Sequence, residues 1–456
     1  MDGLPAYPAF FDKNEMNLAK NSIKAFSIKI IGTLLFTAYS IFLARILAQD
    51  DYGTVMFAIA VATALGPICL LGFDRTTTKF ATIYYAEKQV PLLRGLISRA
   101  RRIGLGFSFA LLLLAGGLML LGLLKSSESK HQAILLAMCV LPFWAWVLLN
   151  REFQRGLKIL VPALVGFQIL RPGLAMLFTA LLYVFGIMNS ASALACLGGA
   201  LAVAIIIDTR RINKALGPAE GQIVYENDKW FGTAKPLIFS IIMYTIVMRA
   251  DMLMVGAILG MEEAARYSVA SRLSAFPDFI LEAIRIVMAP LVAEHFHRNE
   301  LSQLQQRVTR ASQMVFLAVV PFAAAFICFP KFFLGIFGAA YQSADRILIY
   351  LIVGQCINAL CGTVGVLMTM TNLQREHARI VSAGAVTMLV LGFVLIKTLG
   401  AEGAALAMAI TMSLTNITMV IAVKRKLGIV SYMKLSRTDR SGHKQAEMRK
   451  RSEHWV

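Results

Sequence analysis

The sequence predicts an all-α protein that crosses a membrane about twelve times, and three observations lead to this fold class. Hydrophobic residues make up 58% of the 456 residues and charged residues only 16%, whereas a soluble domain has about 25% charged residues. The mean hydropathy is +0.67. The apolar residues also form runs of about 20, the length that a helix needs to cross a bilayer.

Twelve apolar runs are long enough to be membrane-spanning helices. Proline and charged residues interrupt the fifth, eighth and ninth runs, so the limits of these three are the hardest to place. The predicted spans are 23–47, 52–73, 103–124, 132–150, 162–186, 188–207, 234–258, 265–294, 313–336, 347–370, 380–397 and 402–423.

A long polar connection follows the sixth run and separates two sets of six spans, which is a common plan of transporters. The expected parts are a cytoplasmic N-terminal segment, a six-helix bundle, a cytoplasmic linker, a second six-helix bundle and a basic cytoplasmic tail. Their ranges are 1–22, 23–207, 208–233, 234–423 and 424–456.

Lys and Arg residues are concentrated on one side of the predicted membrane. With the N-terminus inside, 33 of the 45 lie in the termini and inner connections, and four lie in the outer connections. Cytoplasmic connections carry the excess of Lys and Arg in membrane proteins, so both termini are expected in the cytoplasm. The net charge of +19 therefore requires no nucleic acid as a partner. The inner connection 74–102 also interleaves apolar residues with cations, as amphipathic interfacial helices do.

The sequence contains no pattern for catalysis, for a cofactor or for a metal. The six cysteines lie in apolar runs and form no C-x-x-C pair, and a buried free Cys behaves as a small hydrophobe. His295 and His297 have no clear third ligand nearby. We expect no catalytic residue, no cofactor and no metal site.

Eight Lys and Arg residues lie inside the predicted spans, where an ionisable side chain is costly and usually marks a substrate or ion path. Only four carboxylates share that depth, those of Asp251, Asp278, Glu282 and Glu294. The excess of cations favours an anionic cargo. The eight cations are Lys29, Arg45, Arg171, Arg249, Arg266, Arg272, Arg285 and Lys331.

Four of these cations have a simpler explanation than a cargo. Arg45, Arg266, Arg272 and Lys331 lie towards the outer ends of their spans. Long cationic side chains at such positions can extend to the interface and keep their charge in water. An interfacial role is therefore the alternative for this group.

The eighth span carries the richest polar stripe. Its members recur every three or four residues, which places them on one side of a helix. They are Ser271, Ser274, Asp278, Glu282 and Arg285. Arg285 follows the two acids by three and seven positions, so a cluster that neutralises itself is an alternative to a transport role. Neutral polar residues in other spans can likewise serve contacts between helices.

Lys29, Arg171 and Arg249 are the cations that the sequence explains least. By these boundaries the six spans of the first half contain no Asp or Glu, and Arg249 lies two positions from Asp251 and hence on another helix face. We therefore expect an anionic head group to bind at Lys29, Arg171, Arg249 and Arg285. The candidates for coupling to H⁺ or Na⁺ are Asp251, Asp278 and Glu282.

Three groups of residues resemble the polysaccharide flippases of the Wzx type. The first is Leu43-Ala44-Arg45-Ile46-Leu47 with Asp51-Tyr52-Gly53. The second is Arg249-Ala250-Asp251, Val255-Gly256 and Tyr267-Ser268-Val269-Ala270-Ser271-Arg272-Leu273, and the third is Gly338-Ala339-Ala340-Tyr341 with Ala344, Leu348 and Gly354. The resemblance extends from about residue 20 to 425, and the order and spacing of the motifs make it specific.

This resemblance implies membership of the multidrug/oligosaccharidyl-lipid/polysaccharide exporter superfamily, whose members have two six-helix bundles around a central cavity and work by alternating access. Its polysaccharide branch moves undecaprenyl-diphosphate-linked oligosaccharides across the bacterial inner membrane for O-antigen, lipopolysaccharide or exopolysaccharide synthesis. The implied partners are the lipid-linked glycan, membrane lipids, and the polysaccharide polymerase and chain-length machinery. Arginine suits the diphosphate because its planar donors match phosphate oxygens.

Three alternatives remain beside a flippase for this cargo. A multidrug antiporter of the same superfamily often uses an acid in the N-terminal bundle, which these boundaries leave without one. A lipid II flippase usually has further spans after the twelfth, where this chain is polar and basic. A polysaccharide polymerase or ligase would be an enzyme with a large outer loop, whereas the longest outer connection here is roughly ten residues. We expect a transporter that is not an enzyme.

Overall fold

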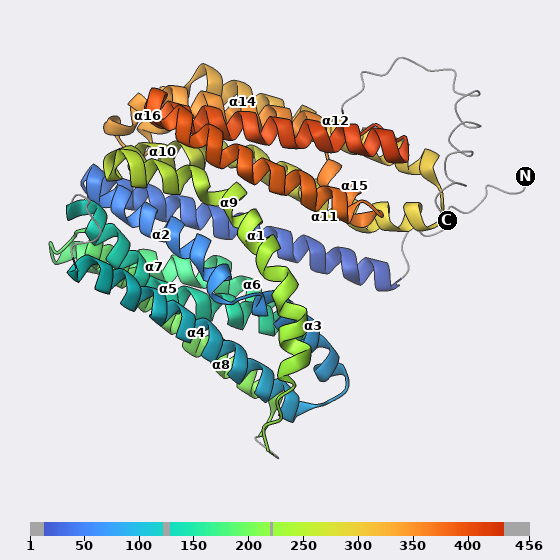
Figure 1. Ribbon diagram of the computed structural model, residues 1–456. Helices are drawn as coiled ribbons and strands as arrows, with labels where there is room; N and C mark the ends of the chain where they lie inside the picture. The colour runs from blue at the N-terminus through green and yellow to red at the C-terminus, as the bar shows by residue number, and fades with distance from the viewer. Residues whose placement is uncertain (1–12, 122–127, 219–221, 433–456) are drawn as a thin grey trace, which may run out of the picture. The chain divides into compact units, whose positions relative to one another are not determined.

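The computed structural model describes residues 13–121, 128–218 and 222–432, which contain helices and no strand (Figure 1). The all-α fold class is therefore confirmed.

The first helices are α1 Lys13–Ile46, α2 Gln49–Cys69, α3 Phe73–Ala86, α4 Val90–Leu120, α5 Glu128–Gly156, α6 Leu160–Val165, the π-helical turn η1 Gly166–Leu170, α7 Arg171–Val184 and α8 Ser190–Leu216. The others are α9 Asn227–Leu259, α10 Met261–Ser274, α11 Phe276–His297, α12 Leu301–Cys328, α13 Pro330–Gly335, the 3-10 turn η2 Ala339–Ala344, α14 Asp345–Cys361, α15 Val364–Met370 and α16 Gln374–Leu427.

Ten helices in the described ranges are long and apolar enough to cross a membrane, and they account for most of the predicted spans. The helix α16 has 54 residues and bends at Gly400, whose φ of 63° and ψ of −142° are not helical. It therefore contains both the eleventh and the twelfth predicted spans. The eighth predicted span is divided between α10 and α11, which meet at Ala275.

The fifth predicted span changes its helical form in the middle. The helix α6 continues into the π-helical turn η1, and α7 then begins with Arg171 and Pro172. A proline has no backbone N–H to donate, so the regular hydrogen-bond ladder is interrupted around it. Single π-helical turns are common where a ladder is disturbed in this way. The turn places Phe167 and Arg171 next to the interruption.

Contacts between helices divide the chain into two compact units. Unit 1 comprises Met1–Val269 and Gly335–Tyr341, and unit 2 comprises Ala270–Leu334 and Gln342–Val456. The helix α9 belongs to unit 1 because it packs along α2, where Gly256 lies against the ring of Phe57. The division into bundles at the linker 208–233 stays a prediction from the sequence.

Unit 1 is organised around α2, which is buried along most of its length. Polar side chains link neighbouring helices of this unit at two places. The Ser40 hydroxyl of α1 lies 2.8 Å from the Tyr52 hydroxyl of α2, and the Tyr39 hydroxyl lies 3.4 Å from that of Thr179 on α7. Such contacts are the helix-linking role that neutral polar residues often have in membrane bundles.

The segment Gly335–Tyr341 is a strap that belongs to unit 1, although the chain on both sides of it belongs to unit 2. It lies at the corner between α1 and α2. The Arg45 Nε donates a hydrogen bond of 2.9 Å to the carbonyl of Ile336, and the rings of Tyr52 and Tyr341 meet edge to face at 5.6 Å.

Unit 2 has its own apolar core, formed by α11, α12, α15 and α16. Its fully buried members include Val292, Val308, Leu367 and Val423. The segment after α16 is joined to α12 by hydrogen bonds, one of them 2.6 Å from the Ser312 hydroxyl to the Ser431 carbonyl. These contacts hold the end of the described chain against the core.

Candidate functional site

Arg171 is the most buried of the predicted anion-binding residues, with 8% of its surface exposed. Its guanidinium lies over three aromatic rings, at 4.3 Å from the centroid of Phe167, 4.5 Å from Trp144 and 5.9 Å from Phe36. We call these rings the aromatic cage. The negative face of an aromatic ring attracts a cation, so the cage stabilises the charge where the sequence offered no explanation for it.

Lys29 is half-buried on α1 and begins the polar stripe expected on this helix. The other members of the stripe serve the helix itself or its packing. The Thr33 hydroxyl donates to the Lys29 carbonyl at 2.9 Å, Thr37 is buried, and Ser40 lies against Tyr52. Of this stripe, only Lys29 has the charge needed to bind an anion.

Arg249 and Asp251 lie on different faces of α9, as their spacing predicts. Arg249 is exposed and forms no ion pair with a residue in the described ranges. Asp251 is buried, with 7% of its surface exposed, and accepts a hydrogen bond of 2.7 Å from the Tyr267 hydroxyl of α10. Tyr267 is thus the partner of Asp251, which the sequence did not reveal.

Arg285 lies in the acidic cluster that the stripe on the eighth span predicts. Its Nη1 is 3.5 Å from the Asp278 carboxylate and 3.8 Å from the Glu282 carboxylate, all on α11. The three side chains are partly exposed. The cluster carries one cation and two acids, so Arg285 is neutralised within its own helix and unit 2.

Three of the four cations expected at the outer ends of spans have polar partners that explain their charge. Arg266 pairs with Glu262 and Glu263 at 2.8 and 2.7 Å. Lys331 lies 3.8 Å from Asp345, and Arg45 donates to a carbonyl of the strap. An anionic cargo is not required to explain the charge of these residues.

Two buried carboxylates lie in helices of the first half, beyond the limits at which the predicted spans end. Glu152 on α5 and Asp208 on α8 are 5% and 2% exposed, and both lie inside helices that are long and apolar enough to span. The predicted spans ended at 150 and 207. The two helices have 29 and 27 residues, longer than the roughly 20 that a bilayer requires, and therefore continue past those limits.

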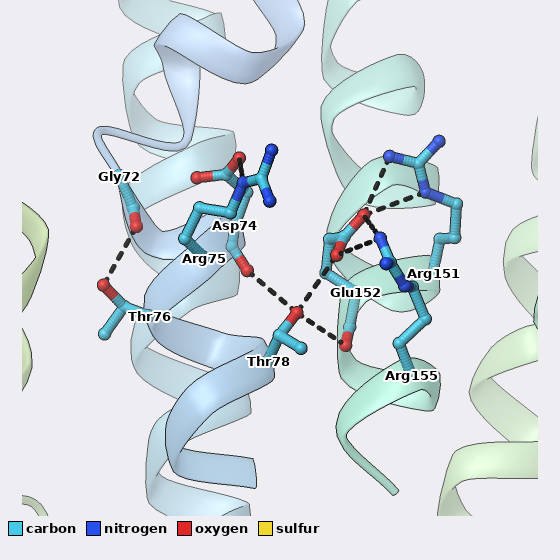
Figure 2. A network of polar contacts seen from close by, with 8 residues as sticks. All are labelled: Gly72, Asp74, Arg75, Thr76, Thr78, Arg151, Glu152 and Arg155. Atoms are coloured by element: carbon cyan, nitrogen blue, oxygen red, sulfur yellow. Dashed lines mark hydrogen bonds and ion pairs between the residues drawn. The ribbon is translucent and has the colours of Figure 1, made fainter. Parts of the chain in front are cut away.

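Glu152 is the centre of a polar network between α3 and α5 (Figure 2). It is 2.8 Å from an Nη of Arg151 and 3.0 Å from an Nη of Arg155. The Thr78 hydroxyl of α3 donates to it at 3.0 Å. The network holds the amphipathic α3 against α5, so this acid is occupied by two cations and a hydroxyl.

Asp208 is neutralised in a similar way, because Arg211 of the same helix lies 3.4 Å from its carboxylate. The backbone of η1 also approaches it closely, since a Cβ on Gly166 would lie 3.1 Å from a carboxylate oxygen. An unpaired charge is costly to bury. Both Glu152 and Asp208 avoid this cost because each forms an ion pair with arginine.

Metal binding has no support in the described ranges, where no group of three potential ligands from His, Cys, Asp and Glu occurs. His295 instead lies 2.7 Å from the Glu300 carboxylate.

Comparison with known proteins finds partial matches to proteins of polysaccharide and glycan biosynthesis. Residues 221–345 match the polysaccharide biosynthesis protein family. A probable low-salt glycan biosynthesis flippase of Haloferax volcanii is 24% identical over 168 residues, which cover 37% of this chain and 36% of that protein. The match thus spans only about a third of that relative.

Solved structures resemble this one over most of its length. An inward-facing multidrug resistance MATE family transporter of the MOP superfamily has a TM-score of 0.70 at 13% identity, over 89% of this chain and 97% of that chain. The lipid II flippase MurJ, in an inward closed conformation, has a TM-score of 0.68 at 16% identity, over 88% and 87%. The comparisons confirm the resemblance seen in the sequence: the chain is similar to glycan flippases and has the fold of the multidrug/oligosaccharidyl-lipid/polysaccharide exporter superfamily.

Proposed function

We propose that this protein is a flippase that moves undecaprenyl-diphosphate-linked oligosaccharides across the bacterial inner membrane by alternating access. The fold, the family match at 221–345 and the glycan flippase relative support the class of transporter. The oligosaccharide repeat unit serves surface polysaccharide synthesis, and the polymerase and chain-length machinery receive it. Both termini lie in the cytoplasm.

The observation that carries the proposal is the exposed cation of Arg249 within a spanning helix. No carboxylate of the described ranges lies within ion-pair distance of it, whereas Arg266 and Arg285 have acids of their own. A cation at this depth is costly without a partner. The diphosphate of the lipid carrier supplies such a partner and is well matched to guanidinium.

The four proposed anion-binding residues contribute in different ways. Arg249 and Lys29 have exposed surface from which to contact the diphosphate directly. Arg285 contributes a cation that lies beside Asp278 and Glu282. These two carboxylates can exchange a proton or bind Na⁺ during the transport cycle. Arg171 adds positive potential from within the aromatic cage, as a positioning residue.

The test compares Arg249→Gln with the matched variant Arg266→Gln. The second variant removes the same charge from a position where Glu262 and Glu263 already pair with the arginine. Both genes are returned to a deletion strain, and lipid carriers and surface polysaccharide are extracted. We expect Arg249→Gln to accumulate prenyl-diphosphate-linked repeat units inside the cell at normal protein level, while Arg266→Gln exports normally. Undiminished surface polysaccharide with Arg249→Gln would overturn this role.

A multidrug or cation antiporter is the second candidate, since a MATE transporter shares the fold and unit 1 contains the buried acids Glu152 and Asp208. Arginine neutralises both acids, which leaves them unsuited to a cationic drug. In the same deletion strain, new drug sensitivity with unchanged lipid carriers would support the antiporter instead.

A further inference from the structure

A second group of cations lies in unit 1, apart from the residues assigned to the cargo. Arg94, Arg101 and Arg102 of α4 line a pocket of about 320 Å³ together with residues of α8 and of the linker after it. Arg101 and Arg102 follow Arg94 by seven and eight positions, about two turns, so the three arginines lie on one side of the helix. The proposed function does not use this pocket.

Among the described residues, no carboxylate lines the pocket, and none of the three arginines forms an ion pair. Four acids of unit 1 are each paired with another cation. These pairs are Asp74 with Arg75, Glu152 with Arg151 and Arg155, Asp208 with Arg211, and Glu226 with Lys229. The described lining of the pocket therefore brings together three cations and no acid.

Neutral groups hold two of the three guanidinium groups in place. Arg101 donates to the Asn150 amide oxygen at 3.1 Å and lies over the ring of Trp146 at 5.5 Å. Arg94 donates to the carbonyl of Gly217 at 2.6 Å. Arg102 is exposed. Preorganised arginine donors of this kind match the oxygens of a phosphate group.

Apart from Ser98 and Asn213, the rest of the pocket lining is apolar, and it continues into an apolar helix surface. Ile97 and Leu105 of α4 line it. Phe109 and Leu113 follow Leu105 in steps of four and are 51% and 74% exposed, as expected for residues that face lipid. A ligand at this site thus meets cations at one end and a hydrocarbon-compatible surface along α4.

We propose that this pocket binds the phosphate of an anionic phospholipid, with an acyl chain lying along α4. The leaflet is the one beside the basic connections, which the distribution of Lys and Arg predicts to be cytoplasmic. Basic pockets between spanning helices on that side are suited to anionic head groups. The site would anchor the end of unit 1 to that leaflet, whatever cargo the protein transports.

The test uses the purified full-length protein in neutral detergent, with native mass spectrometry to count bound lipids. Phosphatidylglycerol, phosphatidylcholine and inorganic phosphate are the probes. The variant is Arg94→Gln with Arg102→Gln, which leaves the packed Arg101 intact. The control is Arg210→Gln with Lys214→Gln, which removes two exposed cations of α8 that do not line the pocket.

We expect the unmodified protein and the control to retain phosphatidylglycerol in preference to phosphatidylcholine. The pocket variant should bind phosphatidylglycerol about tenfold more weakly, as loss of charge-assisted hydrogen bonds implies. An equal loss of phosphatidylglycerol binding in the control variant would overturn the proposed site, because general surface charge would then explain the binding. Inorganic phosphate that displaces the lipid at low concentration would assign the pocket to a soluble anion and overturn the lipid proposal.

Discussion

At the scale of single residues, the structure separates cations that look alike in the sequence. Arg171 and Arg249 both lie in spanning segments, yet one is enclosed by aromatic rings and the other is exposed. Phe167 lies four positions before Arg171 and could have been paired with it from helical spacing. Trp144 and Phe36 come from other helices, so only the folded chain reveals the complete cage.

The aromatic cage should contribute measurably to stability. Phe167→Leu removes the ring closest to the Arg171 guanidinium and should lower the free energy of unfolding by about 1–3 kcal/mol. Phe109→Leu is the control, since Phe109 is half exposed on α4. Thermal unfolding in detergent measures both variants. If Phe167→Leu lowers the free energy of unfolding equally in the Arg171→Met variant and in the protein that keeps Arg171, the cation–π contact contributes nothing to stability.

The Tyr267–Asp251 hydrogen bond of 2.7 Å should show strong coupling between its two partners. Tyr267→Phe leaves a buried carboxylate without its donor and should cost about 1–3 kcal/mol. In an Asp251→Asn background the same change should cost less, because the amide carries no charge. A double-mutant cycle of unfolding free energies measures the difference, and additive effects would rule out the coupling.

At the scale of the elements, α3 and the start of α9 are joined through a polar contact at the end of the linker. The Tyr84 hydroxyl donates to Glu226 at 2.5 Å and accepts from the Trp230 indole at 3.0 Å. Burial, and next the Glu226 carboxylate, raise the pKa of Tyr84 to about 12. Hydrogen bonds from Lys229 and then from Tyr84 lower the pKa of Glu226 below its usual value.

This contact gives a pH dependence with a defined sign. A carboxylate with a lowered pKa in the folded state stabilises that state above its unfolded pKa of 4.5, and the stabilisation is lost as pH falls through the folded pKa. Tyr84→Phe should therefore destabilise the protein at pH 7, and the difference from the unmodified protein should shrink below pH about 4.5. Melting temperatures across this range provide the measurement. A difference that does not vary with pH would refute the contribution of the carboxylate.

Close approach of helices should make Gly53 of α2 hard to replace. A Cβ at this position would lie 1.8 Å from the backbone carbonyl of Met261 on α10, whereas a Cβ at Gly106 of α4 meets nothing within 4 Å. Gly53→Ala must displace α10 and should cost about 2–4 kcal/mol. Gly106→Ala should be neutral or stabilise by about 0.5–1 kcal/mol, because alanine favours helix. Equal melting temperatures for the two variants would contradict the packing of α2 on α10.

At the scale of the whole molecule, hydropathy and charge distribution were sufficient to predict the class of fold. The positions of the buried acids could not be predicted in the same way, because composition does not show where a long helix leaves the apolar layer. Glu152 and Asp208 fell outside the predicted limits for this reason. The pairing of both acids with arginine is likewise seen only in the folded structure.

The predicted orientation can be tested by labelling single cysteines with a membrane-impermeant maleimide after the six native cysteines are replaced by alanine. Arg346→Cys lies in a predicted outer connection and Arg75→Cys in an inner one, and both side chains are more than 70% exposed, at 71% and 72%. Intact cells should label only position 346. Permeabilised cells should label both, and the opposite pattern would reverse the topology.

The strap Gly335–Tyr341 has a consequence for biosynthesis. Unit 1 includes this segment, yet the ribosome must first produce α11, α12 and α13 before the strap emerges. Until then Arg45 and Tyr52 lack the carbonyl of Ile336 and the ring of Tyr341. The first unit of this protein is thus completed only after α11, α12 and α13 have been made, and a nascent chain arrested before residue 341 would present an unfilled corner to the insertion machinery.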